Sequence, residues 1–468
     1  MSKDININVH HITRVEGHGN IVVNIKDGTI EKCEWQVPEA PRFFEAMVRG
    51  RRYDDIQTIV SRICGICSIS HSLVATKAVE DALGLEVSEQ TDLVRHLMHY
   101  SEQLQSHVLH VGYLTAPDLF GEKSVVPLVP KATDAVLKIV KCHRVANQMS
   151  AVLAGRITHP VTLTPGGMTK VPTEQELLSI KAALEDAVPE LVEICKVVLS
   201  VAENLPAFDR ETEYVSLTQT HPAYMDNLSR YSFYHGDITS TDCNGDGDMP
   251  VNKWESVANE YVSSQSTAKW CKWHRDTYFA GAIARYKNQR EHLSPLAKEV
   301  EKMFGMTVDN CNPYMNNVCQ LIEAAHVVEA SLEIIDKLLT MGTKFEKVNV
   351  TPKAGRGYAA IEAPRGILFH AYEFDKNGEC TWGNCCIPTN QNHANIQADF
   401  DKLVPQFMGE GEDALRQKRT AEREKMAAER SGDDKAKVIP MTPAAEQKTE
   451  AEKILERLNW VHRRVSLY

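Results

Sequence analysis

Polar and apolar residues alternate through residues 4–37, the pattern of β-strands that bury one face. Asp27 and Gly28 separate two such segments, NIVVNI and IEKCEW. An Asp-Gly pair between alternating segments is typical of the tight turn of a β-hairpin. Residues 4–37 are therefore predicted to form a small β-rich region.

Beyond that region, apolar residues recur at spacings of three, four and seven, which indicates amphipathic helices. One long helix is predicted to begin after Ser88, a residue type that caps helix N-termini, and to bury Leu93, Leu97, Leu104 and Val108.

Two further long helices are predicted from their end signals. Thr173 and Glu176 have the spacing of a capping box, and Pro189 is expected to kink or break the helix that follows them. Another helix runs through QLIEAAHVVEASLEIIDKLL and is expected to end near Gly342. The chain is therefore predicted to be mainly α with a small N-terminal β region, an α+β fold.

The chain changes character after about residue 408. Charged residues dominate GEGEDALRQKRTAEREKMAAERSGDDKAK, and large apolar residues almost vanish. We therefore divide the chain into one domain, 1–408, and a charged C-terminal extension, 409–468. The extension is expected to be a solvated helix or a disordered tail.

Composition narrows the class of protein. The chain has 468 residues, 43% of them hydrophobic and 25% charged, and a net charge of -11, which argues against nucleic acid as a partner. The N-terminus lacks the apolar core of a secretory signal, and no stretch approaches the ~18 apolar residues of a membrane span. A cytoplasmic location is expected, where the 12 cysteines would be core residues, ligands or catalysts.

Two polar clusters are given structural interpretations. His96, His99, His107 and His110 fall near one helical face, and a buried polar seam is favoured over a metal site because we find no carboxylate or cysteine joining them at ligand spacing. Residues 269–276, KWCKWHRD, are expected to form a partly buried helix face.

The segment SRICGICSISHS carries stronger candidate chemistry. Cys64 and Cys67 form a C-x-x-C motif, which a redox disulfide, half of a zinc site or two core cysteines would explain almost equally well. Gly65 is expected to let the backbone turn tightly so that the two sulfurs converge. Arg62 and His71 are supporting residues, expected to lower the pKa of the thiols through positive charge and hydrogen bonds.

The wider string RICGICSISHSLVATKAVEDALG resembles the first cysteine motif of the large subunit of nickel-iron hydrogenases. Further segments resemble that family in the same order: ITRVEGHGNIVV, PRFFEAMVRGR, LQSHVLHVGYLTAPD, AGRITHPVTLTPGG, EAPRGILFHAYEFD and PTNQNHANIQADF. The resemblance spans about residues 4–400 and is greatest to the cytoplasmic, cofactor-linked or sulfhydrogenase-type branch. It implies a long-helix bundle of the hydrogenase large-subunit type.

The resemblance also implies roles for individual residues. Cys64 would be a terminal nickel ligand, and Cys67 would bridge nickel and iron in a nickel-iron centre. Glu16 matches a carboxylate that passes protons away from the metals, and Arg365 matches a guanidinium above the open metal position. Glu45 matches a ligand of a nearby magnesium ion. Soft thiolates suit nickel and iron, and a carboxylate near a sulfur can relay protons.

The family's reaction is the reversible heterolytic cleavage of dihydrogen. Electrons leave through a small iron-sulfur subunit, so the resemblance implies that partner, together with further electron-transfer subunits of the flavin or heterodisulfide-reductase type.

One family motif is missing from this sequence. The family supplies two more thiolates and a last magnesium ligand from D-P-C-x-x-C-x-x-H near the C-terminus, whereas the last cysteine here is Cys386. Cys385 and Cys386 align with an earlier family segment, and adjacent residues in a strand point to opposite sides.

Three hypotheses follow. A small peptide carrying C-x-x-C could complete the site in trans; the chain could be a catalytically degenerate scaffold or electron-transfer subunit, similar to the quinone-site subunit of respiratory complex I; or it could be a thiol-redox protein. The third fits only one of the matching segments. Cys64, Cys67, Glu16 and Arg365 together favour a metal site over a scaffold, because the complex I relative has lost the cysteines.

Overall fold

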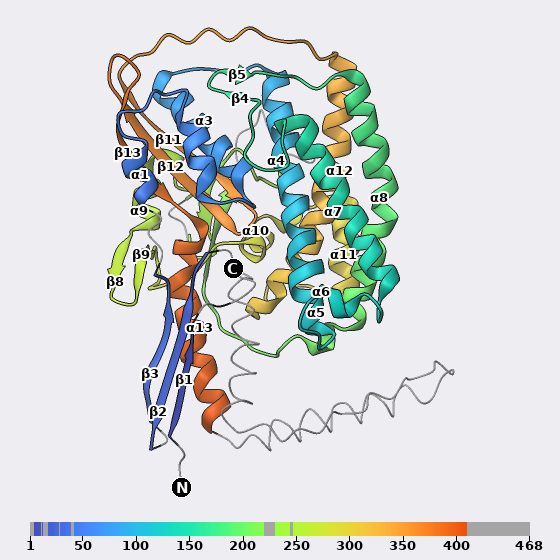
Figure 1. The fold of residues 1–468 in the computed structure, drawn as a ribbon, viewed down its shortest axis with the longest axis vertical. Helices are drawn as coiled ribbons and strands as arrows, with labels where there is room; N and C mark the ends of the chain where they lie inside the picture. Colours follow the sequence, from blue (N-terminus) through green and yellow to red (C-terminus); the bar gives the residue numbers. More distant parts are fainter. Residues whose placement is uncertain are drawn as a thin grey trace.

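The computed structural model describes residues 4–10, 12, 17–27, 29–38, 42–219, 230–243 and 247–409. Long helices stand side by side in one half of the molecule, and small sheets fill the other half (Figure 1). This is the mainly helical α+β fold predicted from the sequence. The 409–468 extension lies outside the described residues except for Gly409.

Four long helices form the helical half: α4 (Glu89–Leu109), α7 (Thr133–Ala154), α8 (Glu174–Ser200) and α12 (Asn316–Met341). Their end signals act as predicted. The Ser88 hydroxyl accepts a hydrogen bond from the Thr91 backbone at 3.1 Å. Thr173 and Glu176 form the capping box, and α12 gives way to Gly342 in the left-handed region.

The predicted break at Pro189 does not occur, because α8 continues through it to Ser200. Proline removes one backbone hydrogen bond from a helix interior. The apolar face of α8 is buried on both sides of that point, by Leu184 and by Leu191, and this packing keeps the helix continuous.

The predicted N-terminal hairpin is present within an antiparallel sheet of β1 (Ile5–Val9), β2 (Asn20–Lys26) and β3 (Thr29–Gln36). This sheet lies beside α13 (Pro388–Gly409), the last described helix (Figure 1). The Trp35 backbone N–H donates to the Gln397 side chain at 2.8 Å. The two ends of the described chain are therefore joined directly.

A second antiparallel sheet, not predicted from the sequence, holds β11 (Gly355–Ala363), β12 (Gly366–Phe374) and β13 (Cys380–Cys386). Helix α3 (Ser68–Leu83) packs on it. A Cβ atom on Gly357 would lie 2.1 Å from the Ala78 carbonyl oxygen, so only glycine allows this approach of strand to helix.

The shorter elements connect these parts. The helices are α1 (Phe43–Met47), α2 (Ile56–Val60), α5 (Ala116–Leu119), α6 (Val125–Leu128), α9 (Trp254–Ala258), α10 (Ala282–Gln289) and α11 (Pro295–Phe304), with a π-helical stretch at His110–Thr115. The strands are β4 (Leu163–Thr164), β5 (Gly167–Met168), β6 (Glu213–Thr218), β7 (Asp237–Ser240), β8 (Tyr261–Ser263), β9 (Ser266–Trp270) and β10 (Tyr278–Phe279). The helix predicted over 269–276 is wrong: β9 ends inside that segment, and the rest of the segment is non-helical. Nowhere in the described chain is a helix long and apolar enough to cross a membrane.

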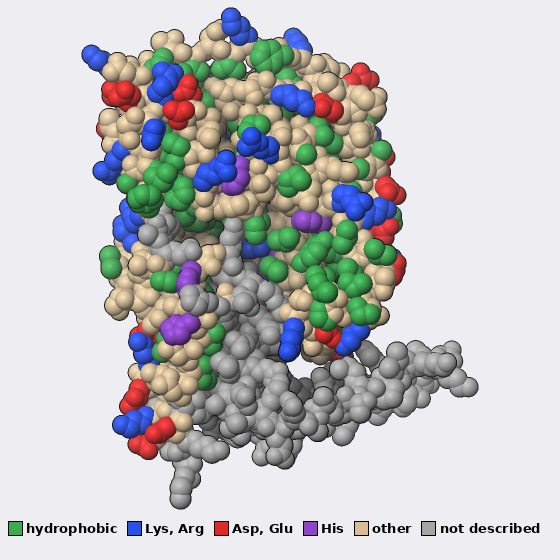
Figure 2. Space-filling model, in the orientation of Figure 1, with side chains coloured by type: hydrophobic (Ala, Val, Ile, Leu, Met, Phe, Trp, Pro, Cys, Tyr) green, Lys and Arg blue, Asp and Glu red, His purple; other side chains and the backbone are tan. Residues whose placement is uncertain are grey.

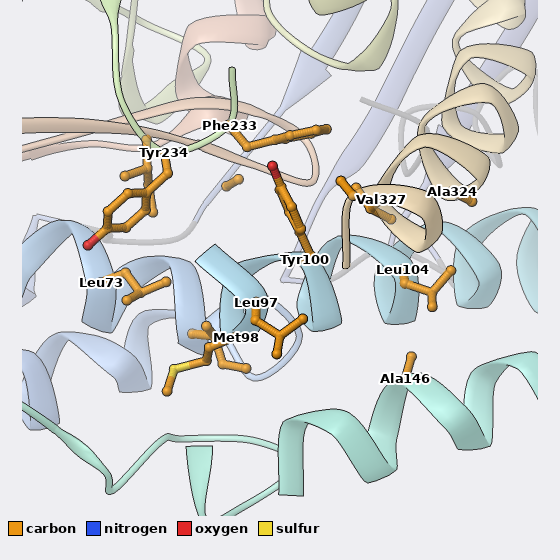
Figure 3. Close-up of a cluster of buried hydrophobic side chains, with 14 of the residues drawn as sticks. Leu73, Leu97, Met98, Tyr100, Leu104, Ala146, Phe233, Tyr234, Ala324 and Val327 are labelled. Carbon is orange, nitrogen blue, oxygen red and sulfur yellow. The ribbon is translucent and has the colours of Figure 1, made fainter. Parts of the chain in front are cut away.

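The core of the helical half is centred on α4. Leu97 and Leu104 point from α4 toward Ala146 on α7, whereas Tyr100 points from the other side toward Phe233 (Figure 3). The rings of Tyr100 and Phe233 lie 5.8 Å apart, edge to face. Helix α4 is therefore buried on both sides, and its polar residues must find partners inside the protein.

The face shown in Figure 2 carries charges of both signs, and hydrophobic side chains gather over α5, α6 and α7. Exposed apolar residues of α6 and its surroundings include Val126, Val129 and Leu137. Apolar side chains grouped in this way are typical of surfaces that contact other proteins.

Candidate metal centre

Cys64 and Cys67 lie in a short loop between the 3₁₀ helix Ser61–Ile63 and α3. The Cys67 backbone N–H donates to the Cys64 sulfur at 3.1 Å, and Cys67 is the N-cap of α3. Both side chains are partly exposed. The two residues are therefore neighbours at the N-terminus of α3, while the predicted convergence of their sulfurs stays a prediction.

Gly65 does not have the role predicted for it. Its backbone lies outside the left-handed region, and a Cβ atom there would meet no atom within 4 Å. The loop thus closes without needing glycine's conformational freedom. Arg62 is on the preceding 3₁₀ helix with its side chain exposed.

The first turn of α3 is capped by a buried acid from another helix. The Glu102 carboxylate, on α4, accepts the backbone N–H groups of Ile69 at 2.7 Å and Ser70 at 3.0 Å, and also the Ser70 hydroxyl. Glu102 is 1% exposed. Its charge satisfies N–H groups that a helix start leaves without partners, and so fixes the position of α3 beside the cysteines.

His159 connects the two sides of the cysteine loop. Its backbone N–H donates to the Ser68 hydroxyl at 2.8 Å, and its Nδ1 lies 3.0 Å from the Ser61 carbonyl oxygen. His159 has a φ of 57°, which is uncommon for a residue other than glycine. The surrounding structure holds this conformation, which supports a positioning role.

His71 begins a buried chain of polar contacts behind the loop. Its Nδ1 lies 3.4 Å from Nε2 of His370, whose Nδ1 lies 2.6 Å from the Tyr372 hydroxyl. That hydroxyl is 3.7 Å from the Cys385 sulfur. Burial lowers the pKa of His71 to about 3, so this imidazole is neutral and does not supply the positive charge predicted for it. Its Nε2 has no hydrogen-bond partner within the described structure.

Arg365 lies in the turn between β11 and β12. Its guanidinium donates to the Ser106 hydroxyl of α4 at 3.1 Å, and its carbonyl oxygen accepts from the Asn392 side chain at 3.4 Å. Both ends of the residue are therefore held by other segments of the chain.

An ionic network is buried beside this turn. Arg285 contacts both carboxylate oxygens of Glu323 at 2.6 Å and Glu362 at 2.9 Å, and His107 lies 2.8 Å from Glu323. All four side chains are fully buried. Burial raises the pKa of Glu362 to about 7 despite the attraction of Arg285, whereas the contacts of Glu323 outweigh its burial and lower its pKa to about 2.

The predicted buried histidine seam is confirmed, since His99, His107 and His110 are fully buried and His96 nearly so. The view that no carboxylate joins these histidines is wrong. Glu323 joins His107 from α12, and Asp92 lies 3.4 Å from His96, four residues before it in the sequence.

Glu45 is 7% exposed on α1. It pairs with Arg42 at 2.9 Å and accepts the Cys385 backbone N–H at 3.1 Å. Burial raises its pKa, although both contacts oppose that effect. One carboxylate at this position fits part of a magnesium site. Glu16 lies outside the described residues.

The two late cysteines point away from each other, as predicted for neighbours in a strand. Cys385 faces Tyr372, while the Cys386 sulfur lies 3.8 Å from that of Cys271 in another part of the core. Cys64 and Cys67 therefore fit one half of a four-thiolate metal set, and Cys385 and Cys386 do not form the other half as a pair.

Sequence reasoning missed Glu102, His159 and His370. His159 and His370 do lie in segments that match family motifs, which is the signal that could have found them. Glu102 carries no local signal, because its partners belong to another helix.

Known proteins that resemble this chain are hydrogenase subunits. A family described as nickel-dependent hydrogenase matches residues 42–140, and a family described as HoxL-like matches residues 6–40. Among curated relatives, the chain is 27% identical over 410 residues to sulfhydrogenase 1 subunit alpha of Pyrococcus furiosus, covering 88% of this chain and 93% of the relative. It is 26% identical over 406 residues to sulfhydrogenase 2 subunit alpha of the same organism, covering 86% and 92%.

Solved structures show the same fold. An NAD+-reducing NiFe hydrogenase in its H2-reduced state superposes with a TM-score of 0.75 and 25% identity, covering 84% of this chain and 91% of that one. The NiFeSe hydrogenase of Dm. baculatum has a TM-score of 0.66 and 21% identity, covering 84% and 91%.

Proposed function

We propose that this chain is a nickel-dependent hydrogenase large subunit, and that it carries the nickel-iron site of a hydrogenase complex that cleaves and forms dihydrogen reversibly. The single observation that supports this most directly is the position of Cys64 and Cys67 in one short loop at the N-terminus of α3, with a 3.1 Å contact from the Cys67 backbone N–H to the Cys64 sulfur. The chain is then an oxidoreductase of the hydrogenase type.

Cys64 and Cys67 would hold the metals through their thiolates. Such a centre, when bound, supplies heterolytic cleavage of dihydrogen. Thiolates are the ligands that soft metals such as nickel and iron prefer. Glu102 holds the start of α3, and His159 holds the residues on both sides of the loop.

The remaining matched residues would handle charge and protons. Arg365, held by Ser106, presents a fixed positive charge, and Glu16 would accept protons from the thiols. His71 is neutral, and a neutral imidazole can donate one N–H toward a sulfur without adding charge. Glu45 would provide one ligand of a magnesium ion.

We propose that a small polypeptide carrying C-x-x-C supplies the missing thiolates in trans. The contacts of Cys386 with Cys271, and of Cys385 with Tyr372, support this, because using either cysteine would require breaking buried packing. The proposed partners also include a small iron-sulfur subunit and further electron-transfer subunits. A cytoplasmic complex is part of the same proposal.

The alternative is a catalytically degenerate, hydrogenase-like scaffold or electron-transfer subunit, similar to the complex I quinone-site subunit. A buried network that needs no metal, Arg285 with Glu323 and Glu362, would hold such a scaffold together equally well. The nickel content of the purified complex distinguishes the scaffold from the catalytic subunit.

The test is metal analysis of the complex purified without oxygen, together with its dihydrogen oxidation activity. The proposal expects about one nickel and one iron per chain beyond the iron-sulfur clusters, lost together with activity in Cys64→Ser and in Cys67→Ser. The control, Cys311→Ser, changes a partly exposed cysteine outside the segments that resemble the family, whose thiol donates to the Asp309 carbonyl oxygen and also contacts Tyr214. Intact clusters without nickel would favour the scaffold, and full activity in Cys64→Ser would rule out the metal-site function.

A further inference from the structure

A second group of metal-binding side chains lies at the other end of α4 from Glu102. Asp92 and His96 are one turn apart on α4, and His235 comes from the segment that precedes β7. Nε2 of His235 lies 2.8 Å from one Asp92 oxygen, and Nδ1 of His96 lies 3.4 Å from the other. One ligand atom from each residue falls within 4.8 Å of the other two.

These separations suit one cation. Bonds of about 2.1 Å from zinc to imidazole nitrogen or carboxylate oxygen place tetrahedral ligand atoms roughly 3.4 Å apart. The 3.4 Å from His96 Nδ1 to one Asp92 oxygen matches that value, whereas the 2.8 Å from His235 Nε2 to the other oxygen is a hydrogen bond that would lengthen when an ion binds. The side chains of Asp92 and His235 are 16% and 22% exposed, so solvent reaches the group and can complete the coordination.

The electrostatic setting suits a cation as well. Burial alone would raise the pKa of Asp92, but the attraction of His96 and the hydrogen bond with His235 hold it well below its usual range. Burial lowers the pKa of His235 to about 4. Carboxylate oxygen and imidazole nitrogen are both ligand types that zinc binds in proteins.

Lys77 is the positive group that faces this cluster. Its ammonium donates to the Tyr234 and Ala360 carbonyl oxygens and lies 4.3 Å above the Tyr234 ring, so its hydrogen bonds point toward the backbone. Burial lowers its pKa to about 8.

The position of His235 is fixed independently of any ion. Gly236 has a φ of 130°, and a Cβ atom there would lie 2.2 Å from the Thr218 carbonyl oxygen, so glycine is required next to His235. The Ser232 hydroxyl donates to the His235 carbonyl oxygen. Tyr234 lies above Leu73 of α3 (Figure 3), with its ring 4.6 Å from that of His96. The ligand is thus presented by an ordered segment.

The other ligand group found among the described residues, Glu260 with Cys271 and Cys386, is arranged differently. The side-chain amide of Asn390 donates to all three, at 3.3, 3.4 and 3.5 Å. Those three atoms already share a hydrogen-bond donor, and the two cysteines are buried, so a substitution in this group serves as a control.

We propose that Asp92, His96 and His235 bind one divalent transition-metal ion of the zinc type, with solvent completing the coordination. The ion clamps the segment 231–236 to α4. His96 rotates away from the Asp92 carbonyl oxygen, to which its Nδ1 is 2.9 Å distant, when it takes up the ion.

The test uses the full-length chain carrying Cys64→Ser and Cys67→Ser, so that failure of the proposed nickel-iron site does not affect the result. Cobalt(II) is titrated into the chelator-treated protein. One equivalent should bind with ligand-field absorption and no thiolate-to-cobalt charge transfer. Asp92→Asn, His96→Gln and His235→Gln should each weaken binding by more than about tenfold, since even outer partners of metal ligands matter that much.

Two controls and a second readout keep the outcome clear. Cys271→Ser and His292→Gln should bind cobalt like the parent. Zinc should raise the Tm of the parent and of both controls, and leave the Tm of the three ligand variants unchanged. The proposal is overturned if the parent binds no cobalt, if the bound cobalt shows thiolate charge transfer, or if the folded ligand variants bind as tightly as the parent.

Discussion

The Glu102 carboxylate lies 3.0 Å from the Ser70 backbone nitrogen, so a buried acid on α4 caps the helix that carries the cysteine loop. A fully buried glutamate almost always has a partner that stabilises its negative charge. Here the partner is the positive end of α3. Stability and site geometry therefore depend on the same contact.

Replacing Glu102 with Gln should lower the free energy of unfolding by roughly 2 kcal/mol, since hydrogen bonds to a charged group contribute that much more than neutral ones and the amide presents a donor where an acceptor is needed. Chemical denaturation would measure the loss. Glu193→Gln, which changes an exposed partner of Lys196, should cost less than about 0.5 kcal/mol. Equal losses in the two variants would contradict the capping role.

Replacement by alanine should destabilise the protein at Gly357 and change little at Gly65. Gly357→Ala places a methyl group 2.1 Å from the Ala78 oxygen and 2.3 Å from the Ala82 nitrogen, so it should cost about 3 kcal/mol by forcing β11 away from α3. Gly65→Ala, in open space, should change the unfolding free energy by less than about 0.5 kcal/mol. Thermal and urea unfolding of both variants would test the contrast.

Glu362 should make stability fall as pH rises toward neutrality. Its pKa is raised from 4.5 to about 7 in the folded protein, so between these values the folded state binds the proton more tightly than the unfolded state does. The contribution of this group is complete below about pH 4.5 and is lost as pH rises through about 7, at up to about 1.4 kcal/mol per pH unit.

The measurement is the difference in unfolding free energy between the natural chain and Glu362→Gln across that range, because other titrating groups cancel in the difference. The natural chain should show the steeper decline. Parallel pH profiles would show that Glu362 is not the titrating group.

His159→Ala should loosen the cysteine loop with little effect on the whole fold. It removes the contact of Nδ1 with the Ser61 carbonyl oxygen, while the backbone bond to Ser68 remains. A loss of about 1 kcal/mol in local stability would speed thiol labelling of Cys64 and Cys67 roughly fivefold. Mass spectrometry of labelled peptides would resolve the rates. His143→Ala on α7, where Asn147 contacts the imidazole, should leave them unchanged.

Local signals predicted the helix starts correctly. The Ser88 cap and the Thr173–Glu176 box are complete within four residues, so the sequence alone determines them. The spacing of Asp92 and His96 is equally local and was visible in the sequence. Their third partner, His235, is 143 residues from Asp92 and could be found only in the folded chain.

The features of the site that could not be predicted depend on contacts between residues far apart in the sequence. The contact between His71 and His370 joins residues 299 apart, and Glu102 reaches the start of a helix 32 residues earlier. The sheet β11–β13 escaped prediction because its residues are buried on both faces, as in β12, so they show no alternation.

The hydrogen bond from Trp35 to Gln397 has a consequence for the order of events during synthesis. At roughly 5–20 residues per second, translation needs roughly 20 to 70 s to travel the 362 residues between them. During that time the β1–β3 sheet is already outside the ribosome, while α13, the helix that packs against it, has not yet been synthesised. The cysteine loop likewise waits for the strand bearing His370, so the thiols of Cys64 and Cys67 leave the ribosome long before the histidine that contacts His71 behind them.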